Sequence, residues 1–172
     1  MQKNNLVKRI EKYSTEADLV NDFMSLLQRG VSPWGPVEAT TEWDYRTGVT
    51  DVLVRTRCGD LVAFEAKLSD WRRAAHQAYR NTTFARKAYV VMPQGIAERA
   101  VVHSDVFLRY GVGLCSVTKQ GISVLIDAPG LSAEPLLPWM HKRAQVFFDS
   151  TAGGATSIGK KNSKRTLQSA GR

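Results

Sequence analysis

The chain has 172 residues, a length typical of one domain with a single hydrophobic core. Hydrophobic residues make up 43% of it, which excludes wholesale disorder, and 24 Lys and Arg against 16 Asp and Glu give a formal net charge of +8. Two cysteines with no CxxC pair exclude a disulfide framework and argue against a zinc site. We find neither a secretory signal nor the roughly 18 consecutive apolar residues of a membrane helix. We therefore expect a cytoplasmic protein with no membrane partner.

The basic excess is concentrated at the C-terminal end. Residues 153–172 contain five basic and no acidic residues, so they contribute +5 of the +8 and the rest contributes +3. Their Gly, Ser, Thr and Lys content cannot bury enough apolar surface to order itself. We expect one domain over residues 1–150 and a disordered basic tail over 151–172. The tail is either a solvated arm or a segment that helps to hold nucleic acid.

Periodicity and turn residues predict the local structure along the whole chain. The expected elements, in chain order, are a helix capped by Ser14 or Thr15 and ended by Gly30, strands over 37–45, 51–57 and 61–67, a helix capped by Ser69 over 70–84, a strand over 87–92, a helix over 96–110, a hairpin of 113–117 and 122–126, and a helix over 135–148. The order helix, three strands, helix, strand predicts an α/β fold with a mixed central sheet flanked by helices. No Gly-rich phosphate loop follows any strand, which excludes the dinucleotide-binding and Walker classes.

The segment 61–67 contains two of the candidate catalytic residues, Glu65 and Lys67. It alternates with period two, so Glu65 and Lys67 are expected to project together from one face of an otherwise apolar strand. A three-residue loop with Gly59 in the left-handed conformation sets the register of the preceding hairpin. In that register Asp51 lies directly opposite Glu65.

Two facing carboxylates repel each other unless a cation lies between them. Mg²⁺ accepts one or two carboxylates together with waters and phosphate oxygens, which suits a site that cleaves phosphodiesters. The sequence therefore predicts a metal site at Asp51 and Glu65. Carboxylates that point to opposite faces of the sheet would contradict it.

These residues also carry a resemblance to a known family. Thr50-Asp51, thirteen residues, Glu65-Ala66-Lys67 and then a helix resemble the PD-(D/E)XK, or restriction-endonuclease-like, nuclease superfamily. The order of the elements resembles the common core of that superfamily over residues 15–93. Thr50 stands where the family nominally has proline. Gln77 and Tyr79 depart from the Gln-x-x-x-Tyr pattern of its exonuclease-like members.

The resemblance implies a metal-dependent nuclease that hydrolyses DNA in repair, recombination or defence against phages and mobile elements. It implies Mg²⁺, replaceable by Mn²⁺, held by Asp51 and Glu65, with Lys67 positioning the attacking water and stabilising charge in the transition state. Glu16 matches an acidic residue near the start of the first helix, and Gln77 matches a glutamine presented beside the site. A chain this small would need a homodimer to cut both strands. Endonuclease and exonuclease activity both stay open.

Each feature also has a structural interpretation. Asp51, Glu65 and Lys67 could form a cross-strand salt-bridge cluster, and Glu16 could be a first-turn helix charge. Arg72, Arg73 and Arg80 lie on the helix face opposite an alanine stripe, where they either neutralise DNA phosphates or serve solubility. The alternative function is a catalytically silent nucleic-acid-binding module of the same fold.

Overall fold

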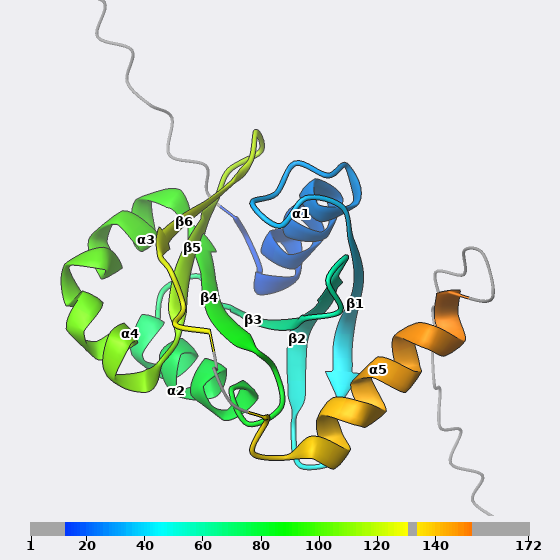
Figure 1. Cartoon of the computed structure of the whole chain (residues 1–172). Coiled ribbons are helices and arrows are strands. Elements are labelled where there is room, and N and C mark those ends of the chain that lie inside the picture. The colour runs from blue at the N-terminus through cyan, green and yellow to red at the C-terminus, as the bar shows by residue number, and fades with distance from the viewer. Residues whose placement is uncertain (1–12, 131–133, 153–172) are drawn as a thin grey trace, which may run out of the picture.

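The computed structural model describes residues 13–130 and 134–152 of the chain (Figure 1). Over these ranges the elements are α1 (Glu16–Gln28), β1 (Val37–Asp44), β2 (Val49–Thr56), β3 (Leu61–Ala66), α2 (Trp71–Asn81), β4 (Lys87–Pro93), α3 (Gln94–Ala100), a 3₁₀ turn η1 (Val101–His103), α4 (Ser104–Tyr110), β5 (Gly113–Val117), β6 (Ile122–Ile126) and α5 (Pro138–Ala152). The predicted order of helix, three strands, helix and strand is confirmed.

The strands form one mixed sheet in the order β1-β2-β3-β4-β5-β6. The first three strands are antiparallel, β3, β4 and β5 are parallel, and β6 returns antiparallel to β5. α1 covers one face, whereas α2, α3, α4 and α5 lie on the other (Figure 1). The predicted class, an α/β fold with a mixed sheet between helices, is therefore correct. Within the described ranges no helix has the length and apolar character needed to cross a bilayer.

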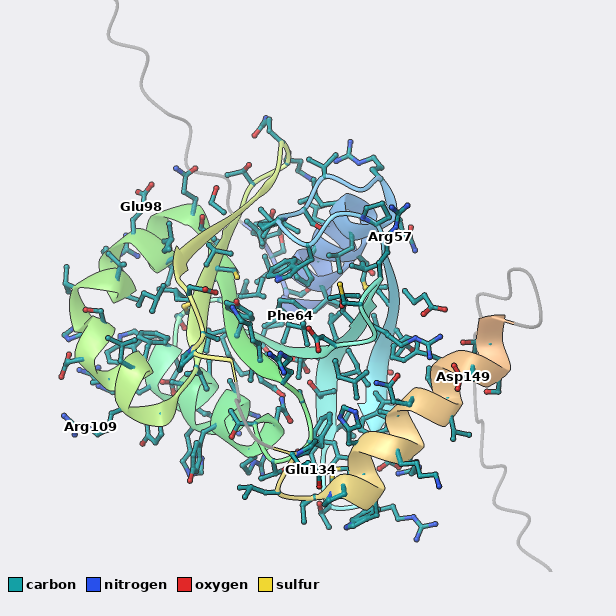
Figure 2. All side chains as sticks on the ribbon, viewed as in Figure 1. Arg57, Phe64, Glu98, Arg109, Glu134 and Asp149 are labelled. Carbon is teal, nitrogen blue, oxygen red and sulfur yellow. The ribbon has the colours of Figure 1, made fainter. Side chains whose placement is uncertain are left out.

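α1 is fixed to its face of the sheet by its cap and by an aromatic cluster. The Thr15 side chain accepts a hydrogen bond from the Asp18 N–H, and the Asp18 carboxylate accepts one from the Thr15 N–H. Phe23 then packs edge-on against Phe64 of β3, with ring centroids 4.9 Å apart. Figure 2 shows Phe64 in the interior, where it also contacts Trp34 and Tyr89. The start of α1 is therefore held close to the end of β3.

α2 begins and ends differently from the prediction. Asp70, not Ser69, is the N-cap, because its side chain accepts the Arg73 N–H at 3.0 Å. The helix ends at Asn81 instead of Phe84, and Phe84 turns away to pack against Trp43 and Tyr45. The predicted alanine stripe is confirmed, since its three alanines are completely buried against the sheet: Ala74, Ala75 and Ala78.

The predicted helix over 96–110 is two helices joined by the 3₁₀ turn at Val101–His103. His103 at that turn stacks on Trp71 of α2, with ring centroids 4.7 Å apart, and Phe107 of α4 stacks on it as well. Trp71 is thus a packing residue. Gly111, with φ of +65°, ends α4 as predicted.

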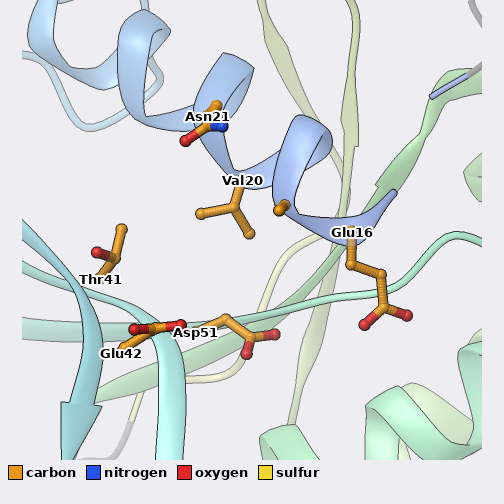
Figure 3. Close-up of a pocket in the computed structure, with 7 residues that line it drawn as sticks. Glu16, Val20, Asn21, Thr41, Glu42 and Asp51 are labelled. Atoms are coloured by element: carbon orange, nitrogen blue, oxygen red, sulfur yellow. The ribbon is translucent and has the colours of Figure 1, made fainter. Parts of the chain in front are cut away.

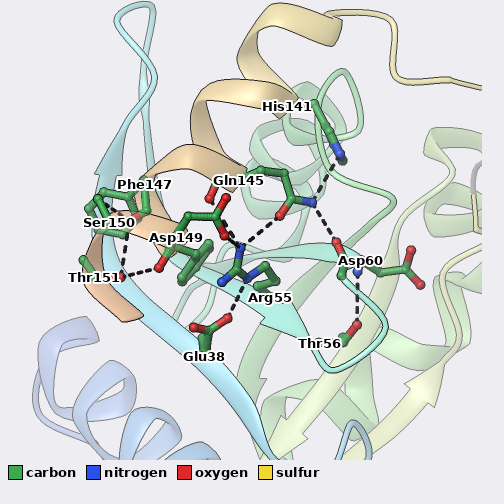
Figure 4. A network of polar contacts seen from close by, with 12 residues as sticks. Glu38, Arg55, Thr56, Asp60, His141, Gln145, Phe147, Asp149, Ser150 and Thr151 are labelled. Carbon is green, nitrogen blue, oxygen red and sulfur yellow. Dashed lines mark hydrogen bonds and ion pairs between the residues drawn. The ribbon is translucent and has the colours of Figure 1, made fainter. Parts of the chain in front are cut away.

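α5 is anchored to the far side of the sheet by both packing and charge. Met140, Ala144 and Phe148 are buried in the core that covers β2 and β3. Arg55 of β2 donates to Glu38 of β1 and to Asp149 of α5, which ties three elements together (Figure 4). The helix continues to Ala152, beyond the predicted domain end at residue 150. The predicted tail lies, from residue 153 on, outside the described residues.

Candidate active site

The pairing of β2 with β3 places the first candidate residues. Val52 lies opposite Phe64 and Val54 opposite Val62, as the hairpin prediction required. Gly59 has φ of +85°, the left-handed conformation expected in the connecting loop. The register was therefore predicted correctly from the sequence.

The two strands separate immediately beyond the pair of Val52 and Phe64, and side chains replace the backbone ladder there. The Thr50 hydroxyl lies 3.3 Å from the Phe64 carbonyl, to which it donates. The Asp51 carboxylate accepts the Ala66 N–H at 2.8 Å. Because the Lys67 N–H bonds to Val91 of β4, the neighbouring Ala66 N–H points toward β2. We call this gap between β2 and β3, filled by the side chains of Thr50 and Asp51, the seam.

A break in β1 accompanies the seam. Glu42 has φ of +52°, a left-handed conformation that is rare for residues other than glycine. It interrupts the alternation, so that Ala39 packs on the α1 side of the sheet whereas Trp43 is buried on the other. Glu42 and Asp51, which would be neighbours in the ladder, are missing from the pairing of β1 with β2.

A pocket of about 410 Å³ opens at this break, between α1 and the two strands (Figure 3). Glu16, Val20 and Asn21 line it from α1, and Thr41, Glu42 and Asp51 line it from the strands. The pKa of the Asp51 carboxyl is raised, mainly by burial and further by Glu16 and Glu42, while the Ala66 N–H and Lys67 oppose the rise. The pocket therefore presents three acidic side chains to solvent beside the seam.

Glu65 reaches the seam from the opposite side. Glu65 is only 2% exposed, and its carboxylate accepts a 2.7 Å hydrogen bond from the Asn81 side chain of α2. Burial and the nearby charge of Asp51 raise the pKa of Glu65 to about 7, although Asn81, Thr50 and Lys67 lower it. Glu65 is therefore a buried carboxyl that is coupled electrostatically to Asp51.

Lys67 interacts with all three nearby carboxylates, those of Glu16, Asp51 and Glu65. Its ammonium forms an ion pair of 2.6 Å with Glu16 of α1, and its charge lowers the pKa of both Asp51 and Glu65. The structure therefore brings all four predicted acidic and basic residues to one end of β3. Glu16 is more than a first-turn helix charge, because it is the direct partner of Lys67.

The expected geometry of the two carboxylates needs correction. Glu65 lies toward α2, as alternation predicts, but Asp51 does not lie beside it on that surface. The Asp51 carboxylate lies in the plane of the sheet and is accessible from the α1 side. Lys67 likewise reaches α1 because β3 ends at Ala66, so it does not project together with Glu65. The two carboxylates therefore do not share one face, contrary to the prediction, but they do not point to opposite faces either, because Asp51 bonds to the Ala66 N–H in the plane of the sheet. They meet across the seam.

Two side-chain oxygen atoms of α2, those of Gln77 and Asn81, are relevant to whether a cation could bind near the seam. The side-chain oxygens of Gln77 and Asn81 are buried and have no hydrogen-bond partner among the described atoms. The two residues are four positions apart, so they share one side of α2. Over residues 13–130 and 134–152, however, no three His, Cys, Asp or Glu side chains are grouped closely enough to hold a metal ion. The acidic donors at the seam, the carboxylates of Asp51 and Glu65, are oxygen ligands, the kind that Mg²⁺ prefers.

Sequence reasoning missed Asn81, Glu42 and the hydrogen bonds of Thr50. Asn81 follows Gln77 by four residues, and this helical spacing was the available signal. A glutamate that breaks a run of alternation gives no comparable signal for a left-handed backbone.

Comparison with known proteins identifies a similar fold but no matching family. No family model matches the chain, and no curated protein matches it. Its structure is similar to that of the SPO1766 protein of unknown function from Silicibacter pomeroyi, with a TM-score of 0.52 and 12% identity over 84% of this chain and 98% of that one. It is also similar to a repair endonuclease from Pyrococcus abyssi, with a TM-score of 0.42 and 16% identity over 63% of this chain. The chain spans about half the length of that endonuclease.

The outer side of α2 is strongly basic. Its exposed residues include Arg72, Arg73 and Arg80, as the helical spacing predicted. Burial raises the pKa of the Tyr45 phenol, while nearby Arg80 lowers it and nearby Glu65 raises it further. The end of α2 that carries Arg80 thus adjoins the part of the seam that holds Glu65, because Asn81 beside it bonds to Glu65.

Proposed function

We propose that this chain is a metal-dependent nuclease that hydrolyses DNA phosphodiester bonds, a member of the PD-(D/E)XK class. The observation that carries the proposal is the meeting of Asp51, Glu65 and Lys67 across the seam. Two carboxyl groups with raised pKa values and one ammonium converge there, and the end of α2 that carries Arg80 lies beside them. An electrostatic role in the fold alone would not require the strands to separate.

The residues have distinct proposed roles. Asp51 and Glu65 hold Mg²⁺ or Mn²⁺, which when bound neutralises phosphate charge and lowers the pKa of a water molecule. Lys67 orients the attacking water and stabilises the charge that develops on the phosphoryl oxygens. Glu16 holds the Lys67 ammonium in place, and Gln77 presents its buried, unpaired oxygen from α2 beside the site. Arg72, Arg73 and Arg80 bind the DNA backbone.

The proposal predicts the effect of removing the central side chains. Glu65→Gln and Lys67→Met should each reduce Mg²⁺-dependent DNA cleavage by about 100-fold or more, because each removes charge from the reacting centre. The measurement is cleavage of linear, circular and single-stranded DNA with Mg²⁺ or with EDTA. DNA binding in EDTA should stay within a few-fold of the wild type.

The chain offers a matched control for each variant. Lys87→Met removes a lysine that is ion-paired with Asp127, and Glu38→Gln removes a carboxylate paired with Arg55, both away from the seam. These controls should cleave like the wild type. Full cleavage by Glu65→Gln, or no divalent-dependent cleavage of any DNA form by the wild type, would refute the proposal.

One observation favours the alternative, a catalytically silent DNA-binding module. Among the described residues the acidic side chains are not grouped as a ready metal site, and the Lys67 ammonium is occupied by Glu16. In that case wild-type protein would bind DNA with no cleavage, and Glu65→Gln would leave binding unchanged. The same cleavage and binding assays therefore separate the two functions.

A further inference from the structure

Asn81 is a buried polar residue that the proposed chemistry has not yet used. It is 0% exposed and lies in the last turn of α2, on the side that carries the buried alanine stripe. A buried amide between an apolar helix side and a sheet needs hydrogen-bond partners to offset its lost hydration. Its partners therefore show what the residue does.

Both partners of the Asn81 amide nitrogen belong to the seam. The nitrogen donates to Glu65 at 2.7 Å and to the Thr50 hydroxyl at 3.1 Å. The Thr50 hydroxyl in turn lies 3.3 Å from the Phe64 carbonyl, where the backbone ladder stops. The two N–H groups of one amide thus connect α2 to both strands that border the seam.

This arrangement fixes the direction of the Glu65 carboxylate. A glutamate side chain has several rotamers, and burial alone does not select one. One Glu65 oxygen is held by Asn81, so the carboxylate can turn only about a restrained position. The same amide holds Thr50, the residue that precedes Asp51, and so it sets the spacing of the two carboxylates across the seam.

We propose that Asn81 is a positioning residue of the metal site, which holds Glu65 and Thr50 so that the Glu65 and Asp51 carboxylates reach one cation. This inference rests on the proposed function. The buried, unpaired Asn81 oxygen supports it, because an acceptor without a partner costs stability, and a purely structural role does not explain that cost.

The test compares Asn81→Ala with Thr82→Ala. The Thr82 side chain also donates a hydrogen bond, but to the Tyr79 carbonyl within α2, so this variant removes a similar hydrogen bond outside the seam. For Asn81→Ala, the affinity for Mg²⁺ measured by titration calorimetry should fall by about 10- to 100-fold. The kcat for DNA should fall while the KM for DNA stays unchanged. Thr82→Ala should change neither quantity.

A second pair of variants keeps the inference testable if Asn81→Ala does not fold. Thr50→Val removes the hydroxyl that Asn81 holds, and Thr50→Ser keeps it. Mg²⁺ affinity should fall in Thr50→Val and be restored in Thr50→Ser.

The failures are distinguishable. Asn81→Ala with wild-type Mg²⁺ affinity, or with a loss of cleavage no greater than its loss of folded protein, would overturn the inference and leave the nuclease intact. Wild-type protein that neither binds Mg²⁺ nor cleaves DNA would overturn the proposed function, and the role of Asn81 with it.

Discussion

Glu65 is a buried carboxyl whose proton binding is coupled to the stability of the fold. The folded state holds the pKa of Glu65 at about 7, above its ordinary value of 4.5, because the charged form loses hydration and faces Asp51. Between these two pH values the folded protein binds more protons than the unfolded chain. By linkage, the contribution of Glu65 to the free energy of unfolding falls as pH rises through this window and then levels off above about 7.

The sign of this effect can be measured in the absence of metal. Glu65→Gln cannot ionise, so at pH 8 it should be more stable than the wild type by about 3 kcal/mol, from about 1.4 kcal/mol per pKa unit. At pH 5 the difference should fall to about 1 kcal/mol or less, because Glu65 is then mostly protonated in the folded protein. The measurement is urea unfolding at both pH values, with Glu38→Gln as a control that removes an ion-paired carboxylate elsewhere.

Mg²⁺ at about 1,000 times its Kd, which contributes about 4 kcal/mol, should reverse that order at pH 8 if Glu65 holds the metal. A cation that binds only the folded state stabilises it, and the gain requires the ionised carboxylate. A wild type that is more stable than Glu65→Gln at pH 8 without metal would contradict the buried, charge-coupled state of this carboxyl.

The break in β1 is the feature of a single element that most affects the site. Glu42 adopts a left-handed backbone, which costs an L-residue about 1–2 kcal/mol, and its charge adds to the acidity around Asp51. Glu42→Gly relieves the backbone strain but adds freedom to the unfolded chain, at a cost of up to about 1 kcal/mol. We therefore expect it to be neutral or to stabilise the protein by up to about 1 kcal/mol.

Two control variants separate the effect of the Glu42 backbone conformation from the effect of the Glu42 charge. Thr41→Gly, one position earlier in the same strand, has no strain to relieve and should destabilise the protein by about 1 kcal/mol. Glu42→Gln keeps the side chain and removes its charge alone. Thermal unfolding of the three variants tests the point, and a loss of more than about 1 kcal/mol in Glu42→Gly would show that the left-handed backbone is not strained.

Periodicity could predict most elements because the sheet has two apolar sides with different partners. Val62 and Phe64 face α1, whereas Leu61 and Ala63 face the other core, and a one-residue slip would exchange them. Alternation fails at Glu42 and Asp51, because the strands separate there and side chains bond in the plane of the sheet. The sequence could therefore predict which residues meet at the end of β3. It could not predict from which face of the sheet each side chain reaches the seam.

The ends of the helices also could not be predicted from the sequence alone. Ser69 and Asp70 are both good capping residues, and only tertiary packing decides which one begins the helix. Phe84 continues the helical pattern of α2, but the core beneath α5 offers it Trp43 and Tyr45, so it leaves the helix. Asn81 becomes the last helical residue as a result, which places its amide over the seam.

At the scale of the whole molecule, the distribution of charge decides how DNA would approach. The pocket beside α1 is acidic, whereas the exposed side of α2 carries Arg72, Arg73 and Arg80. DNA bound across α2 would therefore have its backbone held by arginines while the acidic pocket repels it unless cations are present. Metal-free protein should consequently bind DNA through α2 and not through the pocket.

The salt dependence of DNA binding tests this arrangement. Removing one arginine that neutralises a phosphate should reduce the slope of log K against log salt by about 0.9, so replacing Arg72, Arg73 and Arg80 together with glutamine should reduce it by up to about 2.7. The control replaces three exposed basic residues outside α2, Arg29, Arg57 and Lys142, and makes the same change in net charge. Fluorescence anisotropy with a labelled duplex in EDTA gives the slopes. Equal slopes for the two triple variants would show that binding follows net charge and not the basic side of α2, and would place the DNA elsewhere on the molecule.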